Sequence, residues 1–135
     1  MRTSVTRVMR QLRLNRTEEI FTPFKMIILG RLYDGKPVVP TVLAARERIR
    51  PQSLTRVLAA LEERGFVSRQ MDGADRRRQL IRITEEGKEA LIMDVRRREA
   101  WLSAAMRRRL SPQEREALLT ASRLLDRLTE EEPAP

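Results

Sequence analysis

The stretch from Asp72 to Thr84, DGADRRRQLIRIT, carries three consecutive arginines at a turn that leads into a short run typical of a strand. An arginine guanidinium is planar and binds phosphate through two parallel hydrogen bonds, so this triplet offers recognition of an anion. Three like charges on an exposed turn repel one another, and an anionic partner would offset that repulsion. A turn that is only solvated is the alternative interpretation.

The whole chain of 135 residues is basic, with a formal net charge of +9 from 28 basic and 19 acidic residues. Only Lys25, Lys36 and Lys88 are lysines, so arginine supplies almost all of the positive charge. The predominance of arginine over lysine favours a nucleic-acid partner over a basic surface that only keeps the protein in solution. A bias in genome composition is the alternative explanation of the arginines.

The composition excludes several kinds of chemistry. The chain has no cysteine and no histidine, which excludes thiol redox sensing, disulfides, zinc sites of the Cys/His kind and histidine general bases. No Ser/His/Asp or phosphate-loop arrangement can be assembled either, so we expect no enzyme, no catalytic residue, no metal and no cofactor. The N-terminus lacks the apolar run of a secretory signal, and no segment approaches the roughly 20 apolar residues that span a bilayer. We therefore expect a cytoplasmic protein without a membrane partner.

Several helices and one hairpin must position the arginine triplet. Aromatic residues make up only 4% of the chain while aliphatic residues are plentiful, which predicts a mostly α fold. Apolar residues at helical spacing predict helices over residues 3–20, 23–33, 40–48, 51–64 and 85–109, and a last helix after Ser111. The runs 66–71 and 79–84 predict an antiparallel hairpin, and residues 37–39 allow no more than an edge strand.

Residue types at the helix ends support these boundaries. Pro51 suits the first turn of a helix, and Gly65 suits a left-handed cap at its end. Ser111 and Glu114 form a capping-box sequence. The last helix is expected to turn one apolar side inward, namely Leu118, Ala121, Leu125 and Leu128.

Two short helices joined by a tight turn and followed by a hairpin describe a winged helix-turn-helix. The major groove of B-DNA admits one helix, whose N-terminal residues reach the base edges. The predicted major-groove contacts are Gln52, Ser53, Thr55 and Arg56. The hairpin tip is predicted to place an arginine in the minor groove while its neighbours meet phosphates, with Asp75 positioning an arginine rather than cancelling its charge. The predicted tip residues are Asp75, Arg76, Arg77 and Arg78.

Motifs along nearly the whole chain resemble those of the MarR family of bacterial transcriptional regulators. They are LAA, then PQSLTRVLAALEERGFVSRQ, then Asp75-x-Arg77 followed by Ile83-Thr84 and EEGKEAL, and finally LSPQEREALL. The resemblance implies that the helix over 51–64 enters the major groove. It also implies that Arg77 enters the minor groove while bonded to Asp75. Members of this kind are homodimers, built through the first and last helices, and bind palindromic DNA near promoters that they usually repress.

The sequence departs from the family pattern in the turn before the recognition helix. Glu47 and Arg48 stand where members commonly carry a leucine and then a glycine, so a reshaped turn is one expectation. Arg46, Arg48 and Arg50 would gather positive charge beside the DNA backbone. We therefore expect a strong, salt-dependent affinity that is independent of base sequence.

The organisation that we expect is one domain over residues 1–135. Residues 22–87 form the winged helix lobe, residues 1–20 and 88–130 form dimerisation helices, and residues 131–135 form a disordered tail. The terminal helices are apolar on one side and too few to enclose themselves, which predicts a two-fold homodimer on double-stranded DNA. The operator is then palindromic, with half-sites about 34 to 36 Å apart.

Two points stay open at the level of sequence. Trp101, with Phe24 and Tyr33, is a candidate lining for a pocket that binds a small-molecule effector, and ordinary core or interface packing of the tryptophan is the alternative. The main hypothesis of a sequence-specific repressor has two rivals. One is an architectural or RNA-binding protein without sequence specificity, and the other is a winged-helix module that binds proteins.

Overall fold

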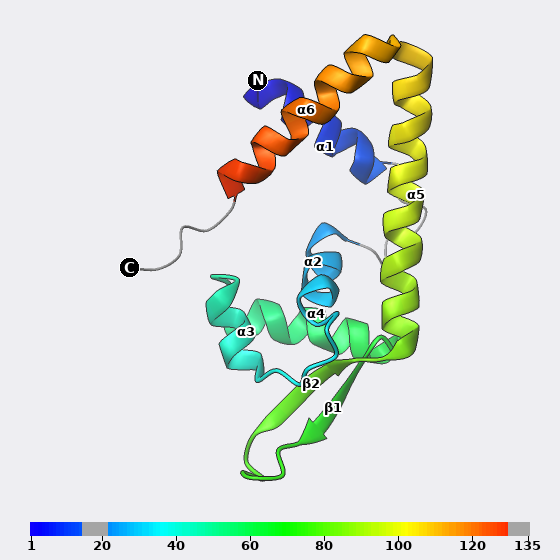
Figure 1. The fold of residues 1–135 in the computed structure, drawn as a ribbon. Helices are drawn as coiled ribbons and strands as arrows, with labels where there is room; N and C mark the ends of the chain where they lie inside the picture. The colour runs from blue at the N-terminus through cyan, green and yellow to red at the C-terminus, as the bar shows by residue number, and fades with distance from the viewer. Residues whose placement is uncertain (15–21, 130–135) are drawn as a thin grey trace. The chain divides into compact units, whose positions relative to one another are not determined.

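A computed structural model describes residues 1–14 and 22–129 of the protein, and Figure 1 shows its ribbon. The elements in chain order are α1 (Arg2–Leu14), α2 (Pro23–Arg31), α3 (Pro40–Arg46), α4 (Pro51–Glu63), β1 (Val67–Met71), β2 (Gln79–Ile83), α5 (Glu85–Arg109) and α6 (Pro112–Thr129). This order confirms the mostly helical fold with a small hairpin. The predicted residues 15–20 of the first helix and the tail 131–135 lie outside the described residues.

The chain divides into two compact units, residues 1–98 and residues 99–135. The first unit contains the lobe formed by α2 to β2 and the beginning of α5. The second contains the end of α5 and all of α6. The organisation as one domain with dimerisation helices stays a prediction.

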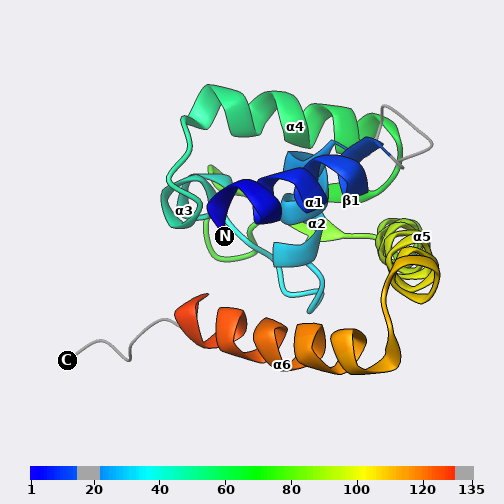
Figure 2. The same cartoon turned by 90° about the horizontal axis from the view of Figure 1, so that it is seen from above.

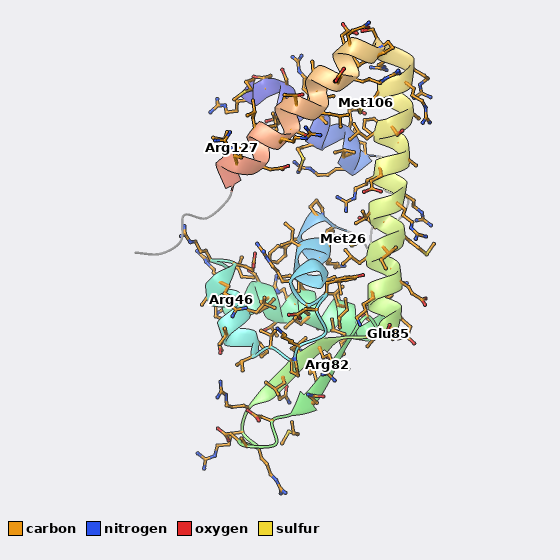
Figure 3. All side chains as sticks on the ribbon, viewed as in Figure 1. Met26, Arg46, Arg82, Glu85, Met106 and Arg127 are labelled. Atoms are coloured by element: carbon orange, nitrogen blue, oxygen red, sulfur yellow. The ribbon has the colours of Figure 1, made fainter. Side chains whose placement is uncertain are left out.

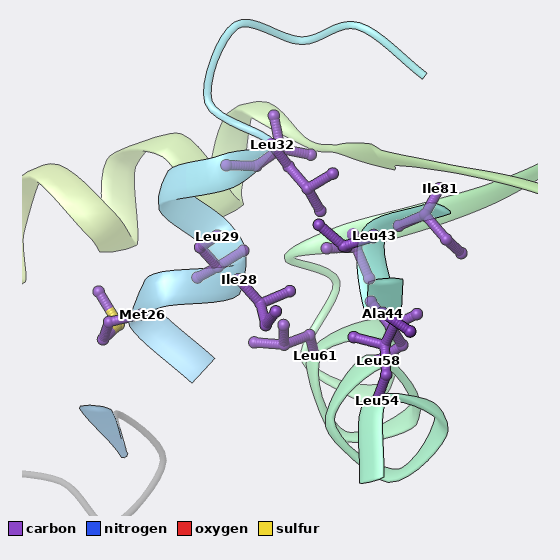
Figure 4. Close-up of a cluster of buried hydrophobic side chains, with 12 residues drawn as sticks. Met26, Ile28, Leu29, Leu32, Leu43, Ala44, Leu54, Leu58, Leu61 and Ile81 are labelled. Atoms are coloured by element: carbon purple, nitrogen blue, oxygen red, sulfur yellow. The ribbon is translucent and has the colours of Figure 1, made fainter. Parts of the chain in front are cut away.

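Aliphatic side chains from three helices and the hairpin form the core of the lobe. In α4, Leu54, Leu58 and Leu61 are each 1% exposed, as their helical spacing predicts, whereas Val57 is only half-buried. Figure 4 shows the buried side chains converging from α2, α3, α4 and β2. The cluster consists of Met26, Ile28, Leu29, Leu32, Leu43, Ala44, Leu54, Leu58, Leu61, Val67, Ile81 and Ile83.

Two helices of the lobe end two residues before their predicted ends, for a local reason in each case. After α2, the chain turns at Gly35, which has a φ of 74° and whose N–H donates to the carbonyl of Leu32 at 3.0 Å. The predicted end at residue 33 is therefore too late. After α3, Arg48 has a left-handed φ of 51°, so the helix ends at Arg46.

The two strands pair in an antiparallel hairpin whose register runs from Val67 opposite Ile83 to Met71 opposite Gln79. Val38 adds a single bridge to Ile81, which confirms that the run before α3 forms no more than an edge contact. In Figure 1 the green hairpin projects beyond α3 and α4. We call β1, β2 and the connecting residues 72–78 the wing.

The base of the wing is joined to the start of α5 by a compact hydrogen-bonded corner. The Thr84 hydroxyl donates to the carbonyl of Gly65 and accepts the N–H of Gly87 at 3.0 Å, so Thr84 caps α5 and holds the end of α4. Gly87 is buried against the backbone of Phe66, where an added Cβ would lie 2.1 Å from the Phe66 carbonyl oxygen. Figure 2 shows α4 along one side of the lobe, with α3 at its N-terminal end.

The second unit begins its last helix with the predicted capping box. The N–H of Ser111 donates to Glu114 Oε2 at 2.8 Å, and the N–H of Glu114 donates to Ser111 Oγ at 3.2 Å. The prediction that one apolar side of this helix is turned inward is wrong for the single chain, because the residues of that side are exposed to solvent. They are Leu118, Ala121, Leu125 and Leu128.

Candidate nucleic-acid interface

The N-terminal half of α4 exposes the side chains that the sequence predicts as base contacts. Its buried stripe points into the core, so the opposite face must point outward because the helix repeats every 3.6 residues. Gln52, Arg56 and the small Ala59 lie exposed on that outward face, and Ser53 and Thr55, also exposed, flank it. The helix therefore offers a polar surface with no bulky apolar side chain at its middle.

Thr55 differs from the other three in its hydrogen bonding. Its hydroxyl donates to the carbonyl of Pro51, one turn earlier, at 2.9 Å. A threonine engaged in this way keeps its lone pairs and its methyl group for a partner. Thr55 thus suits an amino group or an apolar atom of a base, while Gln52 and Arg56 retain their full set of donors.

Two aspartates order the tip of the wing through its backbone. The Asp75 carboxylate accepts the N–H of Arg77 at 3.0 Å, and the Asp75 carbonyl accepts the N–H of Arg78 at 2.9 Å. The Asp72 carboxylate accepts the N–H of Ala74 at 3.0 Å. These bonds preorganise the turn, as aspartates commonly do in Asx turns.

The arginines of the tip keep their charge exposed. Arg76, Arg77 and Arg78 are exposed, and within residues 1–14 and 22–129 no ion pair joins them to a carboxylate. In Figure 3, side chains that end in nitrogen project from the hairpin tip into open space. The bond between Asp75 and Arg77 runs to the Arg77 backbone, so the guanidinium is left for an anion.

The turn between α3 and α4 is closed in the manner of a glycine-capped helix. The N–H of Ile49 donates to the carbonyl of Ala44 at 3.0 Å, and the N–H of Arg48 donates to that of Ala45 at 3.1 Å. This pair of bonds is the Schellman motif, which requires a left-handed residue. Arg48 adopts that conformation here with a φ of 51°.

Glu47 is tied to α2 by an ion pair that sequence reasoning missed. Its carboxylate lies 2.7 Å from Arg31 Nε, and the Glu47 side chain is only 14% exposed. The pair holds the turn against the C-terminal end of α2. A glutamate in place of a leucine was a signal to look for a basic partner.

The predicted backbone contacts lie around the N-terminal end of α4. Arg46, Arg48 and Arg50 are exposed, and Figure 3 marks Arg46 on α3. The first turn of α4 has no acidic residue, and its N-cap, Arg50, makes no side-chain cap bond. The partial positive charge of a helix N-terminus and three arginines are unfavourable together without an anion. A phosphate group suits this position.

The three candidate effector residues do not come from one compact unit. Phe24 is half-buried against the core of the lobe, and Tyr33 is 46% exposed just beyond α2. Trp101 belongs to the second unit and is half-buried. The effector pocket stays a prediction.

The described residues hold neither a cluster of metal-binding side chains nor a helix that could span a membrane. Residues 1–14 and 22–129 contain no group of three or more acidic, cysteine or histidine side chains that could hold a metal ion. Within the same ranges, every helix is too short or too polar to cross a bilayer.

Comparison with known sequences gives a consistent result. A model of the MarR family matches residues 21–78. An uncharacterised HTH-type transcriptional regulator of Mycobacterium bovis is 35% identical over 130 residues, which cover 96% of this chain and 90% of the relative. A second such regulator, from Mycobacterium leprae, is 33% identical over the same length and the same shares.

Solved structures share the fold over nearly the full chain. A candidate transcriptional regulator from Pseudomonas aeruginosa has 33% identity and a TM-score of 0.85, covering 97% of this chain and 91% of that one. The structure of MarR has 22% identity and a TM-score of 0.73, covering 96% and 90%. A mutant of S. aureus MepR bound to an oligodeoxyribonucleotide has 20% identity and a TM-score of 0.68, covering 94% of each chain. The last two similarities concern the fold alone.

Proposed function

The chain belongs to the MarR family of transcriptional regulators, and on that premise we propose that it is a sequence-specific repressor. It acts in the cytoplasm as a homodimer on a palindromic operator, by binding and not by catalysis. The observation that carries this proposal is the pairing of two exposed surfaces on one lobe. One is the polar face of α4, and the other is the preorganised arginine tip of the wing.

The two surfaces suit the two grooves of DNA. The major groove admits α4, where Arg56 can bind a guanine through two hydrogen bonds and Gln52 can do the same with an adenine. The narrow minor groove concentrates negative potential and attracts an inserted arginine. Arg77 takes that role because its backbone is fixed by Asp75 while its side chain is exposed.

The remaining arginines supply affinity without specificity. Arg46, Arg48 and Arg50 at the helix turn, with Arg76 and Arg78 at the tip, face phosphates on either side of the groove contacts. Each phosphate that they neutralise releases a bound counterion, so affinity falls as salt rises. These contacts fix the register in which α4 meets the bases.

A homodimer accounts for the apolar side chains that the single chain leaves in water. Val5, Val8 and Met9 of α1 are exposed, as are Leu118, Leu119, Leu124, Leu125 and Leu128 of α6. Burying such surface against a second copy is favourable, and a two-fold axis then repeats the recognition helix on the DNA. A small-molecule effector whose binding releases the DNA is part of the proposal.

Selection of bound sequences from a random DNA pool tests the proposal. The expected result is a two-fold symmetric consensus, with half-site centres about one helical turn apart. In competition at fixed salt, this consensus should bind at least about 10³-fold more tightly than random DNA. Equal displacement by random DNA would instead favour the architectural protein without sequence specificity.

The other rival, a winged-helix module that binds proteins, is tested by Arg77→Ala. We expect this change to weaken binding to the selected operator, since it removes the minor-groove contact. An operator affinity equal to that of the wild type, with regulation intact, would favour the protein-binding module.

A further inference from the structure

Arg69 joins the recognition helix to both strands of the wing. Its Nε lies 2.7 Å from Glu62 Oε2, and one of its terminal nitrogens donates to Gln79 Oε1 at 3.2 Å. Glu62 belongs to the last turn of α4, Arg69 to β1 and Gln79 to β2. One planar guanidinium on β1 thus contacts two other elements, α4 and β2.

The strand register explains why Arg69 reaches both partners. Arg69 pairs with Ile81, and Gln79 pairs with Met71 two residues further along, so Arg69 and Gln79 are diagonal neighbours on one face. Ile81 is fully buried, which identifies this face as the one turned toward the core. The same face therefore carries apolar side chains at the base of the wing and, nearer the tip, the polar link to α4.

Little else holds the outer part of the wing. Val38 bridges to Ile81, and no third strand lies beyond that point among the described residues. An isolated two-stranded hairpin is only marginally stable, and its twist changes easily. The arginine tip at 76–78 lies beyond both the Val38 bridge and Arg69. In the described part of the chain, the Arg69–Glu62 pair is the outermost side-chain hydrogen bond between the wing and α4.

We propose that Arg69 is a positioning residue, which fixes the wing relative to α4 and so sets the spacing between the two groove contacts. The inference rests on the proposed function. The minor groove is only about 6 Å wide, so a small swing of the wing moves Arg77 out of it. Glu62 and Gln79 act with Arg69 by holding its guanidinium.

The ion pair contributes more to geometry than to stability. The Arg69 side chain is 30% exposed and that of Glu62 is 40% exposed, and pairs this accessible add little to the free energy of unfolding. Removing one partner should leave the lobe folded. A change in DNA binding can then be separated from unfolding.

The test measures operator affinity for Glu62→Ala, Gln79→Ala and the control Glu63→Ala, each with and without Arg77→Ala. Glu63 is exposed and neighbours Glu62, so its replacement removes the same charge without breaking the link. We expect Glu62→Ala and Gln79→Ala to weaken specific binding about three- to fivefold. We expect no weakening from Glu63→Ala, because loss of a negative charge beside DNA favours binding.

The decisive readout is the coupling with Arg77. In the Glu62→Ala and Gln79→Ala variants, a freely moving wing no longer keeps Arg77 in the minor groove. Arg77→Ala should therefore reduce operator affinity clearly less in these variants than in the wild type. Thermal melting of each variant checks that it is folded. A purely structural role would lower the melting temperature without changing the cost of Arg77→Ala.

The outcomes separate the two proposals. Specific binding by the wild type with fully additive losses, or equal effects of Glu62→Ala and Glu63→Ala, overturns the role of Arg69 and leaves the proposed function standing. Absence of any sequence preference in the wild type overturns the proposed function and the role of Arg69 with it.

Discussion

Arg48 holds a backbone conformation that glycine adopts without strain. A left-handed φ costs a residue with a side chain about 1 to 2 kcal/mol, and Arg48 bears that cost at a φ of 51°. The exposed guanidinium lies in the turn before α4, where a phosphate is expected. We infer that arginine at this position lowers the stability of the fold through backbone strain and raises the affinity for the DNA backbone through its charge.

Replacing Arg48 with glycine should show both effects. We expect Arg48→Gly to raise the free energy of unfolding by about 0.5 to 1 kcal/mol, since relief of strain outweighs the greater flexibility of glycine when unfolded. The salt slope of DNA binding should fall by about one unit. Urea denaturation and DNA titrations at several salt concentrations measure the two effects. An unchanged salt slope would show that Arg48 does not contact phosphate.

Arg56 and Arg78 should separate base contacts from phosphate contacts. Arg56→Ala is expected to relax the sequence preference at a cost of about 1 to 3 kcal/mol, because a bidentate contact to a base is lost. Arg78→Ala should weaken binding to all DNA alike and lower the salt slope by about one unit. Competition titrations with operator and random DNA distinguish them. The same uniform loss from both variants would mean that α4 is not the recognition helix.

At the scale of elements, the corner between the wing and α5 depends on Gly87. A Cβ there would lie 2.1 Å from the Phe66 carbonyl oxygen and 2.9 Å from Ile83 Cγ1, so the helix and the strand base must separate. We expect Gly87→Ala to lower the free energy of unfolding by about 1 to 3 kcal/mol through overpacking. Denaturant unfolding measures the loss.

Gly30 in α2 offers a matched control for that change. An added Cβ at Gly30 meets nothing within 4 Å, so alanine there should raise helix stability by about 0.5 to 1 kcal/mol. Opposite signs for the two glycines are the expected pattern. If both substitutions proved neutral, the close packing of α5 on the wing base would be wrong.

At the scale of the whole molecule, the exposed leucines of α6 bear on assembly. Leu125 is 40% exposed in the single chain, and its burial in a dimer is the simplest use of an apolar side chain at that position. We expect Leu125→Asp to weaken dimerisation at least about tenfold, since an unpaired charge would be buried. Sedimentation at micromolar protein measures the shift toward monomer.

Thr120→Asp adds the same charge at an exposed polar position of α6 and serves as the control. It should leave the dimer intact. A Leu125→Asp monomer should also lose most of its affinity for the palindromic operator while retaining weak binding to a half-site. Wild-type protein that sediments only as a monomer at moderate salt would contradict the dimer.

Much of the lobe and of its exposed surfaces could be predicted from the sequence, because those features have local causes. The stripe of Leu54, Leu58 and Leu61 follows from helical spacing, and the capping box at Ser111 follows from hydrogen bonds between near neighbours. The same helical spacing places Gln52 and Arg56 on the exposed face opposite that stripe. Helix ends were less predictable, since the left-handed turn at Arg48 has no signal in its residue type.

Tertiary structure alone decided which distant residues meet. Arg69 meets Glu62 because the chain turns at Gly65 and brings the wing beside α4, whereas it meets Gln79 through the strand register. Arg31 meets Glu47 because α2 packs near the turn. Such contacts depend on how whole elements pack, which residue spacing does not encode. The sequence by itself determined the helices, the hairpin and the arginine tip, whereas the packing of these elements decided what holds that tip in place.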